Sequence, residues 1–128
     1  MGGYGVASTL KDYKPKSAEE EAIKMVLLAF ESVWKKHDLQ GVLTLLHENA
    51  QLMIGPERRI VSKEEYSVYL PTRMENFPHT KLCEPTISIV GDKASIKLLV
   101  DMIKYQRTFE FFMFRENSKW FITGWDTN

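Results

Sequence analysis

The feature that most constrains this chain is an apolar run near its C-terminal end, Thr108-Phe109-Glu110-Phe111-Phe112-Met113-Phe114. A β-strand with one face in water alternates apolar and polar side chains, because successive side chains point to opposite faces of the sheet. In this run both alternating sets are apolar, and a single carboxylate, Glu110, lies in the middle. The run therefore predicts a strand whose two faces are both covered.

Length and charge limit what the chain can be. With 128 residues, of which 44% are hydrophobic, it has the size of one domain with one core. Lysine plus arginine equals aspartate plus glutamate, at 17 each, so no overall field attracts nucleic acid or an anionic membrane, and we expect neither partner. The lone Cys83 excludes an internal disulfide and a cysteine-cluster metal site. We expect no metal and no cofactor.

The N-terminal region carries no targeting signal that the sequence reveals. No stretch approaches the roughly 20 apolar residues of a membrane helix, and the start lacks a basic segment followed by an apolar one. A cytoplasmic protein is the default expectation, and a secreted protein whose signal has been removed is the alternative. Residues 1–16 show no sustained periodicity and predict a flexible leader before a single domain over residues 17–128.

Three helices are predicted from their N-terminal caps. Ser17-Ala18-Glu19-Glu20 and Ser62-Lys63-Glu64-Glu65 are capping boxes, and Asp38 is a single cap between them. Apolar residues at three- and four-residue steps follow each cap. We expect helices over residues 17–36 and over residues 39 to 46 or 47, and a third helix that begins at Ser62. Pro71 leaves the end of the third helix open, and the alternatives are a kink at Leu70 and a continuation to Met74.

Six strands are predicted around these helices. A small hairpin covers residues 50–54 and 58–61, and four longer strands cover 80–90, 93–104, 107–115 and 120–125. This order indicates an α+β fold in which three helices pack on the concave face of a curved, mostly antiparallel sheet. In the second long strand, the set expected to face the helices is Ala94, Ile96, Leu98, Val100 and Met102.

Two stretches resemble a known superfamily. The first stretch runs from His37 to Ala50 and contains the core Asp-Leu-Gln-Gly-Val-Leu. The second is Phe112-Met113-Phe114, followed after a polar turn by Lys119-Trp120-Phe121-Ile122. Both stretches resemble the nuclear transport factor 2-like superfamily. Ketosteroid isomerases, scytalone dehydratases and polyketide-cyclase-like proteins share that cone-shaped, cystatin-like fold. The resemblance covers about Ser17 to Asp126, and it implies a cavity between the first helix, the third helix and the concave sheet face.

Ketosteroid-isomerase chemistry can be compared with this sequence position by position. The general-base aspartate of that family falls on Ile54, and its oxyanion-donating tyrosine falls on Phe30. Neither side chain can perform that role. The third member of the family's set, a protonated acid, falls on Glu110. The resemblance therefore argues against a ketosteroid-isomerase reaction and leaves one acid as a catalytic candidate.

Glu110 shares its strand face with Phe112 and Phe114, which predicts that its carboxyl group points into the cavity. Burial there would raise its pKa; the alternatives are a buried glutamate satisfied by a nearby Tyr or Arg, or one turned to solvent by a bulge. His79, in a loop that could rim the cavity, is the second candidate for a proton-transfer or ligand-binding role. The residues expected to line the cavity are Phe30, Trp34, Ile54, Tyr66, Tyr69, Met102 and Phe112.

The opposite face of the sheet needs a cover that the chain does not supply. The residues expected there are Leu99, Asp101, Ile103, Phe109, Phe111 and Met113. A second copy of the chain is the simplest cover, because the leader is too polar, and the resemblance implies the same sheet-to-sheet homodimer. We therefore expect a homodimer.

Three functions remain open from the sequence. The first is a pocket protein that binds a small apolar ligand, because the predicted lining is largely apolar. The second is an isomerase, dehydratase or cyclase acting on a small cyclic carbonyl compound, with Glu110 and His79 or Tyr66 exchanging protons. The third is a homodimeric association module. The missing base at Ile54 makes an enzyme the weaker expectation.

Overall fold

The structure is a computed structural model that describes residues 8–104 and 106–127. The fold is α+β, as predicted. In chain order its elements are η1 (Leu10–Asp12), α1 (Ala18–Lys35), α2 (Leu39–Leu45), β1 (Gln51–Ile54), β2 (Arg59–Ser62), α3 (Lys63–Asn76), β3 (Lys81–Val90), β4 (Lys93–Asp101), β5 (Gln106–Glu116) and β6 (Lys119–Thr127). Each predicted helix and strand is present, and most ends differ from the prediction by only a few residues.

The predicted caps begin the helices. The Ser17 hydroxyl accepts a hydrogen bond from the Glu20 amide, and the Ser62 hydroxyl accepts one from the Glu65 amide, each at 3.1 Å. The Asp38 carboxylate accepts one from the Gly41 amide at 2.9 Å. These bonds satisfy amide groups that have no partner within the helix. Helix α3 then continues through Pro71 to Asn76, so the proline does not end it.

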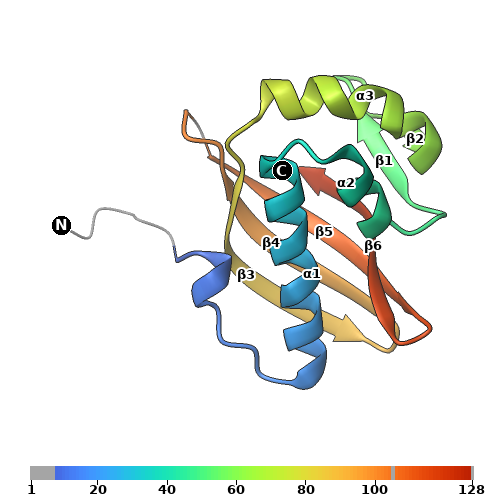
Figure 1. Ribbon diagram of the computed structural model, residues 1–128. Coiled ribbons are helices and arrows are strands. Elements are labelled where there is room, and N and C mark those ends of the chain that lie inside the picture. The colour runs from blue at the N-terminus through green and yellow to red at the C-terminus, as the bar shows by residue number, and fades with distance from the viewer. Residues whose placement is uncertain (1–7, 105, 128) are drawn as a thin grey trace.

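The four long strands form one antiparallel sheet in the order β3-β4-β5-β6, and β1 and β2 form a separate hairpin. Figure 1 shows α1 lying along one face of the four-stranded sheet, with α3 crossing near one end of that face. The buried side of α1 consists of Ile23, Leu27, Phe30 and Trp34. Their three- and four-residue spacing gives the helix one apolar stripe, which packs on the sheet.

The pairing of β4 with β5 decides which side chains of the apolar run face the helices. Ile96 lies opposite Phe111 and Ala94 lies opposite Met113, and directly opposed residues project from the same face of a sheet. Ile96, Phe111 and Met113 are all buried, with exposed fractions of 0%, 3% and 2%. Phe112 lies opposite Ser95 and is 39% exposed. The helix-facing set of β4 is thus as predicted.

The predicted faces of β5 are wrong and must be exchanged. Phe109, Phe111 and Met113 share the face that the helices cover, and they do not form the outer face. Glu110 and Phe112 alternate with them and project from the outer face. Of the other residues predicted for a dimer face, Leu99 is half-buried on the outer side of β4, and Ile103 is 71% exposed at the turn that follows β4. Asp101 accepts a hydrogen bond from the Ile103 amide at 2.9 Å.

Part of the leader packs against the domain. Leu10 in η1 is 1% exposed, and Thr9 forms a β-bridge with Cys83 of β3. The Lys24 ammonium group of α1 donates hydrogen bonds to the carbonyl oxygens of Lys11 at 3.1 Å and Tyr13 at 2.6 Å. Residues 8–16 therefore lie against α1 and β3 instead of extending freely, and residues 1–7 lie outside the described part of the chain.

None of the helices within residues 8–104 and 106–127 combines the length and the apolar character needed to cross a membrane.

Candidate functional site

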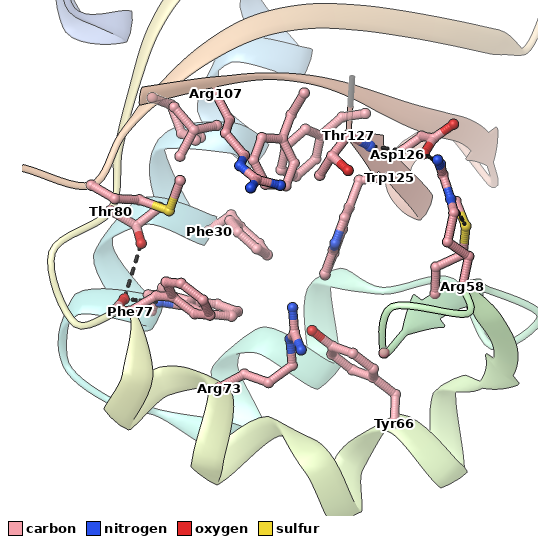
Figure 2. Close-up of a pocket in the computed structure, with 18 of the residues that line it drawn as sticks. Phe30, Arg58, Tyr66, Arg73, Phe77, Thr80, Arg107, Trp125, Asp126 and Thr127 are labelled. Carbon is pink, nitrogen blue, oxygen red and sulfur yellow. Dashed lines mark hydrogen bonds and ion pairs between the residues drawn. The ribbon is translucent and has the colours of Figure 1, made fainter. Parts of the chain in front are cut away.

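A cavity of about 420 Å³ lies between α1, α3, the β1–β2 turn and the helix-facing side of the sheet. It contains aromatic side chains from α1, β5 and β6, aliphatic side chains from β3 and β4, and polar side chains from α3 and the strand ends. Figure 2 shows these side chains converging on one space. This is the position that the resemblance implied for a cavity.

The apolar wall is a cluster of aromatic rings centred on Phe30. Its ring centroid lies 5.6 Å from that of Trp34, 5.5 Å from that of Phe111 and 5.5 Å from that of Trp125. The Phe111 and Trp125 contacts are edge-to-face, an arrangement that aromatic rings prefer. Because the rings come from α1, β5 and β6, the wall forms only when these elements pack together.

Hydrogen bonds anchor the segment after α3 at the cavity. The Trp34 indole N–H donates to the carbonyl oxygen of Phe77 at 2.9 Å, and the Thr80 hydroxyl donates to the same oxygen at 3.0 Å. Figure 2 shows the Phe77–Thr80 bond at the edge of the cavity. These bonds join α1 to the α3–β3 connection and hold the Phe77 ring at the cavity wall.

The charged groups of the cavity are predominantly positive. Among the described residues that line it, the basic side chains are Arg58, Arg73 and Arg107, and the one carboxylate is Asp126. Arg58 forms an ion pair with Asp126. The Arg73 guanidinium lies 5.8 Å from the centre of the Phe77 ring, within the range of a cation–π interaction.

Tyr66 supplies a buried hydroxyl group. The residue is 1% exposed, and its ring packs edge-to-face against Trp125 with centroids 5.8 Å apart. Burial raises the pKa of Tyr66 to about 12, and the nearby Arg73 opposes that rise. The phenol is therefore protonated at neutral pH and can donate a hydrogen bond. Figure 2 shows its hydroxyl and the Arg73 guanidinium close together and directed toward the cavity.

The predicted lining is only partly present. Phe30, Trp34, Tyr66 and Met102 line the cavity, whereas Ile54, Tyr69 and Phe112 do not. Ile54 is buried in the core at 7% exposure, and Phe112 projects from the opposite side of the sheet. Tyr69 lies at the surface, where its hydroxyl accepts a hydrogen bond from Arg59 at 2.8 Å.

The two acid–base candidates lie away from this space. Glu110 alternates with the inward-facing Phe109 and Phe111 and lies opposite the exposed Lys97 of β4, so it projects from the outer face of the sheet. The prediction that it points into the cavity is wrong, because Phe109 and Phe111 occupy the inward positions of β5. His79 is exposed in the loop before β3 and is not among the cavity residues. The structure does not bring Glu110 and His79 together.

The arginines were missed, although two of them have a sequence signal. Arg73 follows Tyr66 by seven residues, or about two helical turns, so both lie on one side of a helix that continues past Pro71. Arg107 precedes Phe109 and Phe111 by two and four residues, which places it on their face of β5. Arg58, at the β1–β2 turn, has no comparable periodicity.

The comparisons with known proteins give the fold. No protein-family model matches the chain, and no curated protein matches it. Solved structures do match. A protein from Shewanella frigidimarina NCIMB 400, provisionally named a ketosteroid isomerase, is 18% identical over 84% of this chain and 94% of its own, with a TM-score of 0.70. A nuclear transport factor 2-like protein of unknown function from Shewanella baltica OS155 is 20% identical over 91% and 98%, with a TM-score of 0.70.

A third similar structure comes from Xanthomonas campestris and is provisionally named a calcium/calmodulin-dependent protein kinase II association domain. It is 12% identical over 99% of this chain and 96% of its own, with a TM-score of 0.72. These likenesses define the class as an α+β, cystatin-like fold with helices on one face of an antiparallel sheet. Within that class, the chain has the nuclear transport factor 2-like fold.

Proposed function

We propose that this protein binds a small, largely apolar molecule in the cavity between α1, α3 and the sheet. The observation that carries the proposal is the cavity itself, whose volume of about 420 Å³ falls within the range of small-molecule pockets. Aromatic rings form much of its wall, and a few polar groups converge on it from α3 and the strand ends. Apolar walls with a small number of polar points are the usual composition of such a site.

An enzymatic role has less support. A general base must lie within hydrogen-bonding reach of the proton that it removes. Among the described lining residues the one carboxylate, Asp126, is already paired with Arg58. Glu110 projects from the other face of the sheet. One structural neighbour has a ketosteroid isomerase name, which keeps an isomerase acting on a small cyclic carbonyl compound as the alternative.

Binding can be measured at the tryptophan side chains. Trp34 and Trp125 line the cavity, whereas Trp120 does not, so the three indole N–H signals in a ¹⁵N–¹H spectrum distinguish the site from the rest of the molecule. We expect 2-naphthamide, a neutral aromatic molecule, to shift the Trp34 and Trp125 signals saturably and to leave Trp120 unchanged. No saturable shift, or equal shifts of all three signals, would contradict the proposal.

A pair of variants on one strand controls for indirect effects. Val100 lines the cavity from β4 and Leu99 projects from its outer side, so Val100→Phe fills the space while Leu99→Phe adds a ring elsewhere. We expect the first substitution to abolish the naphthamide shifts and the second to preserve them. Unchanged binding by a folded Val100→Phe protein would place the ligand outside the cavity.

We also propose that two copies associate through the outer face of the sheet. The observation that favours this is Phe112, which is 39% exposed in the middle of β5, with the half-buried Leu99 on the adjacent strand. An exposed ring on a sheet face is favourable to bury against a partner. The association surface is thus centred on Phe112 and Leu99 and excludes Phe111 and Met113.

A further inference from the structure

We propose that the cavity selects an apolar molecule that carries a carboxylate, and that the Arg73 guanidinium and the Tyr66 hydroxyl bind that carboxylate. This inference rests on the proposed function, because it assigns the chemical class of the ligand to the same cavity. It rests on the charge of the lining, on the position of Arg73, and on the hydrogen-bonding character of Tyr66.

The charge of the cavity lining favours an anionic ligand. Three guanidinium groups and one carboxylate line the cavity among the residues that the structure describes, and the carboxylate is paired with Arg58. A concave site with low-dielectric walls focuses the field of such groups. Asp126 pairs with Arg58, and no described carboxylate pairs with Arg73, so the part of the lining near α3 carries an excess of positive charge although the whole chain has a formal net charge of +0. An electropositive, aromatic-walled space favours an apolar anion over a neutral or cationic molecule.

Arg73 provides a guanidinium group at the cavity. Its side chain is half-buried on α3, and within the described part of the chain it takes part in no ion pair. Charged groups that leave water are ordinarily paired. Its guanidinium group interacts with the Phe77 ring and the Tyr66 side chain, and neither carries a negative charge at neutral pH. A bound carboxylate would supply the missing counter-charge, and guanidinium groups bind carboxylates through two parallel hydrogen bonds.

Tyr66 provides a hydrogen-bond donor beside Arg73. Its hydroxyl is buried, and it keeps its proton at neutral pH because burial disfavours the phenolate. A protonated phenol beside a guanidinium can donate to an anion, so the two groups form one donor pair. Figure 2 shows both directed toward the space that Phe30 and Trp125 border. A carboxylate held at this pair would leave the rest of the ligand against the aromatic wall.

The test compares 2-naphthoate with 2-naphthamide, which differ in charge and hardly in shape. We expect naphthoate to bind at least about tenfold more tightly, since hydrogen bonds to charged groups are the stronger ones. We expect Arg73→Gln to remove this preference while naphthamide binding persists. Tyr66→Phe should reduce naphthoate affinity by a smaller factor than Arg73→Gln does, because it removes one neutral hydrogen-bond donor and no charge. Arg73→Lys should restore part of the preference, because lysine keeps the charge without the paired donors.

A matched control removes the same charge outside the cavity. Arg59 lies at the surface and pairs with Glu65, so Arg59→Gln should leave the naphthoate preference intact. Equal affinity for the two compounds in the unaltered protein, or a preference that survives Arg73→Gln, would overturn the carboxylate inference and leave the binding proposal standing. If neither compound shifts the Trp34 and Trp125 signals, the binding proposal itself fails, and the inference fails with it.

Discussion

Replacing Phe111 by alanine should destabilise the protein far more than the same replacement at its neighbour Phe112. Phe111 is 3% exposed, and its ring packs on Phe30 and Trp125 with centroids 5.5 Å and 5.4 Å away. Removing a buried phenylalanine ring costs about 3–5 kcal/mol, from lost transfer free energy and from the cavity that remains. Phe112 is 39% exposed on the outer face, so its removal should cost about 1 kcal/mol or less.

Urea unfolding followed by circular dichroism measures both costs. In thermal unfolding, an entropy of about 2.1 cal/mol/K per residue gives a chain of 128 residues a shift of roughly 11 to 19 °C in Tm for Phe111→Ala. The urea dependence of the unfolding free energy should be similar in both variants, because neither changes the surface exposed on unfolding by much.

Equal costs, or a larger cost at Phe112, would refute the assignment of the two faces of β5. A homodimer interface at Phe112 would add to the cost of Phe112→Ala, and the protein concentration is the control for this effect. If Phe112 lies in a homodimer interface, the Phe112→Ala cost should vary with protein concentration, because dimerisation stabilises the folded state by mass action. The Phe111→Ala cost comes from packing within one chain. It should stay large at the lowest concentration that the assay allows.

Three further predictions follow from particular contacts. Gly124→Ala should lower the unfolding free energy by about 1–3 kcal/mol in the same urea assay, because a Cβ there would lie 2.5 Å from the Gln51 carbonyl oxygen; an unchanged free energy would show that β1 can move away. Phe112→Lys should convert the expected dimer to a monomer by light scattering, and a wild-type monomer at micromolar concentration would contradict the dimer. Naphthoate affinity should stay constant between about pH 6 and pH 9, measured by calorimetry, since guanidinium groups do not titrate in this range and burial raises the pKa of Tyr66 to about 12. Only as pH approaches that value should affinity fall, and a midpoint inside the range would indicate a different binding group.

Local signals explain why the helices and strands were predictable. Ser17, Asp38 and Ser62 begin helices through bonds to amides three residues later, so the sequence alone contains both partners. Hairpin tips such as Gly91, whose φ is +63°, are equally local. The end of α3 was uncertain because the effect of Pro71 depends on what packs around the helix, and the structure shows the helix continuing past it.

The faces of β5 depend on register, which is not a local property. Both alternating sets of the run are apolar, so hydrophobicity does not choose between them, and a shift of one residue exchanges them. The predicted pairing with the neighbouring strand β4 did indicate which side chains of β5 face the helices. The predicted ends of β4 and β5, residues 104 and 107, pair even-numbered residues of β4 with odd-numbered residues of β5, which puts Phe111 on the same face as Ile96 and Val100. The structure keeps this face and pairs Phe111 with Ile96. Placing Glu110 in the cavity followed the ketosteroid-isomerase resemblance, and the cross-strand pairing contradicts it.

The charge of the cavity has a different origin, because it exists only once distant elements meet. Arg58 comes from the turn after β1, Arg73 from the last turns of α3, and Arg107 from the start of β5. Arg73 can share a side of α3 with Tyr66 only because the helix does not stop at Leu70. A chain that ended this helix at the proline would keep the aromatic wall and lose the Arg73–Tyr66 pair. The proposed selectivity for a carboxylate therefore depends on the six residues of α3 that follow Leu70, and the size of the cavity alone would not provide it.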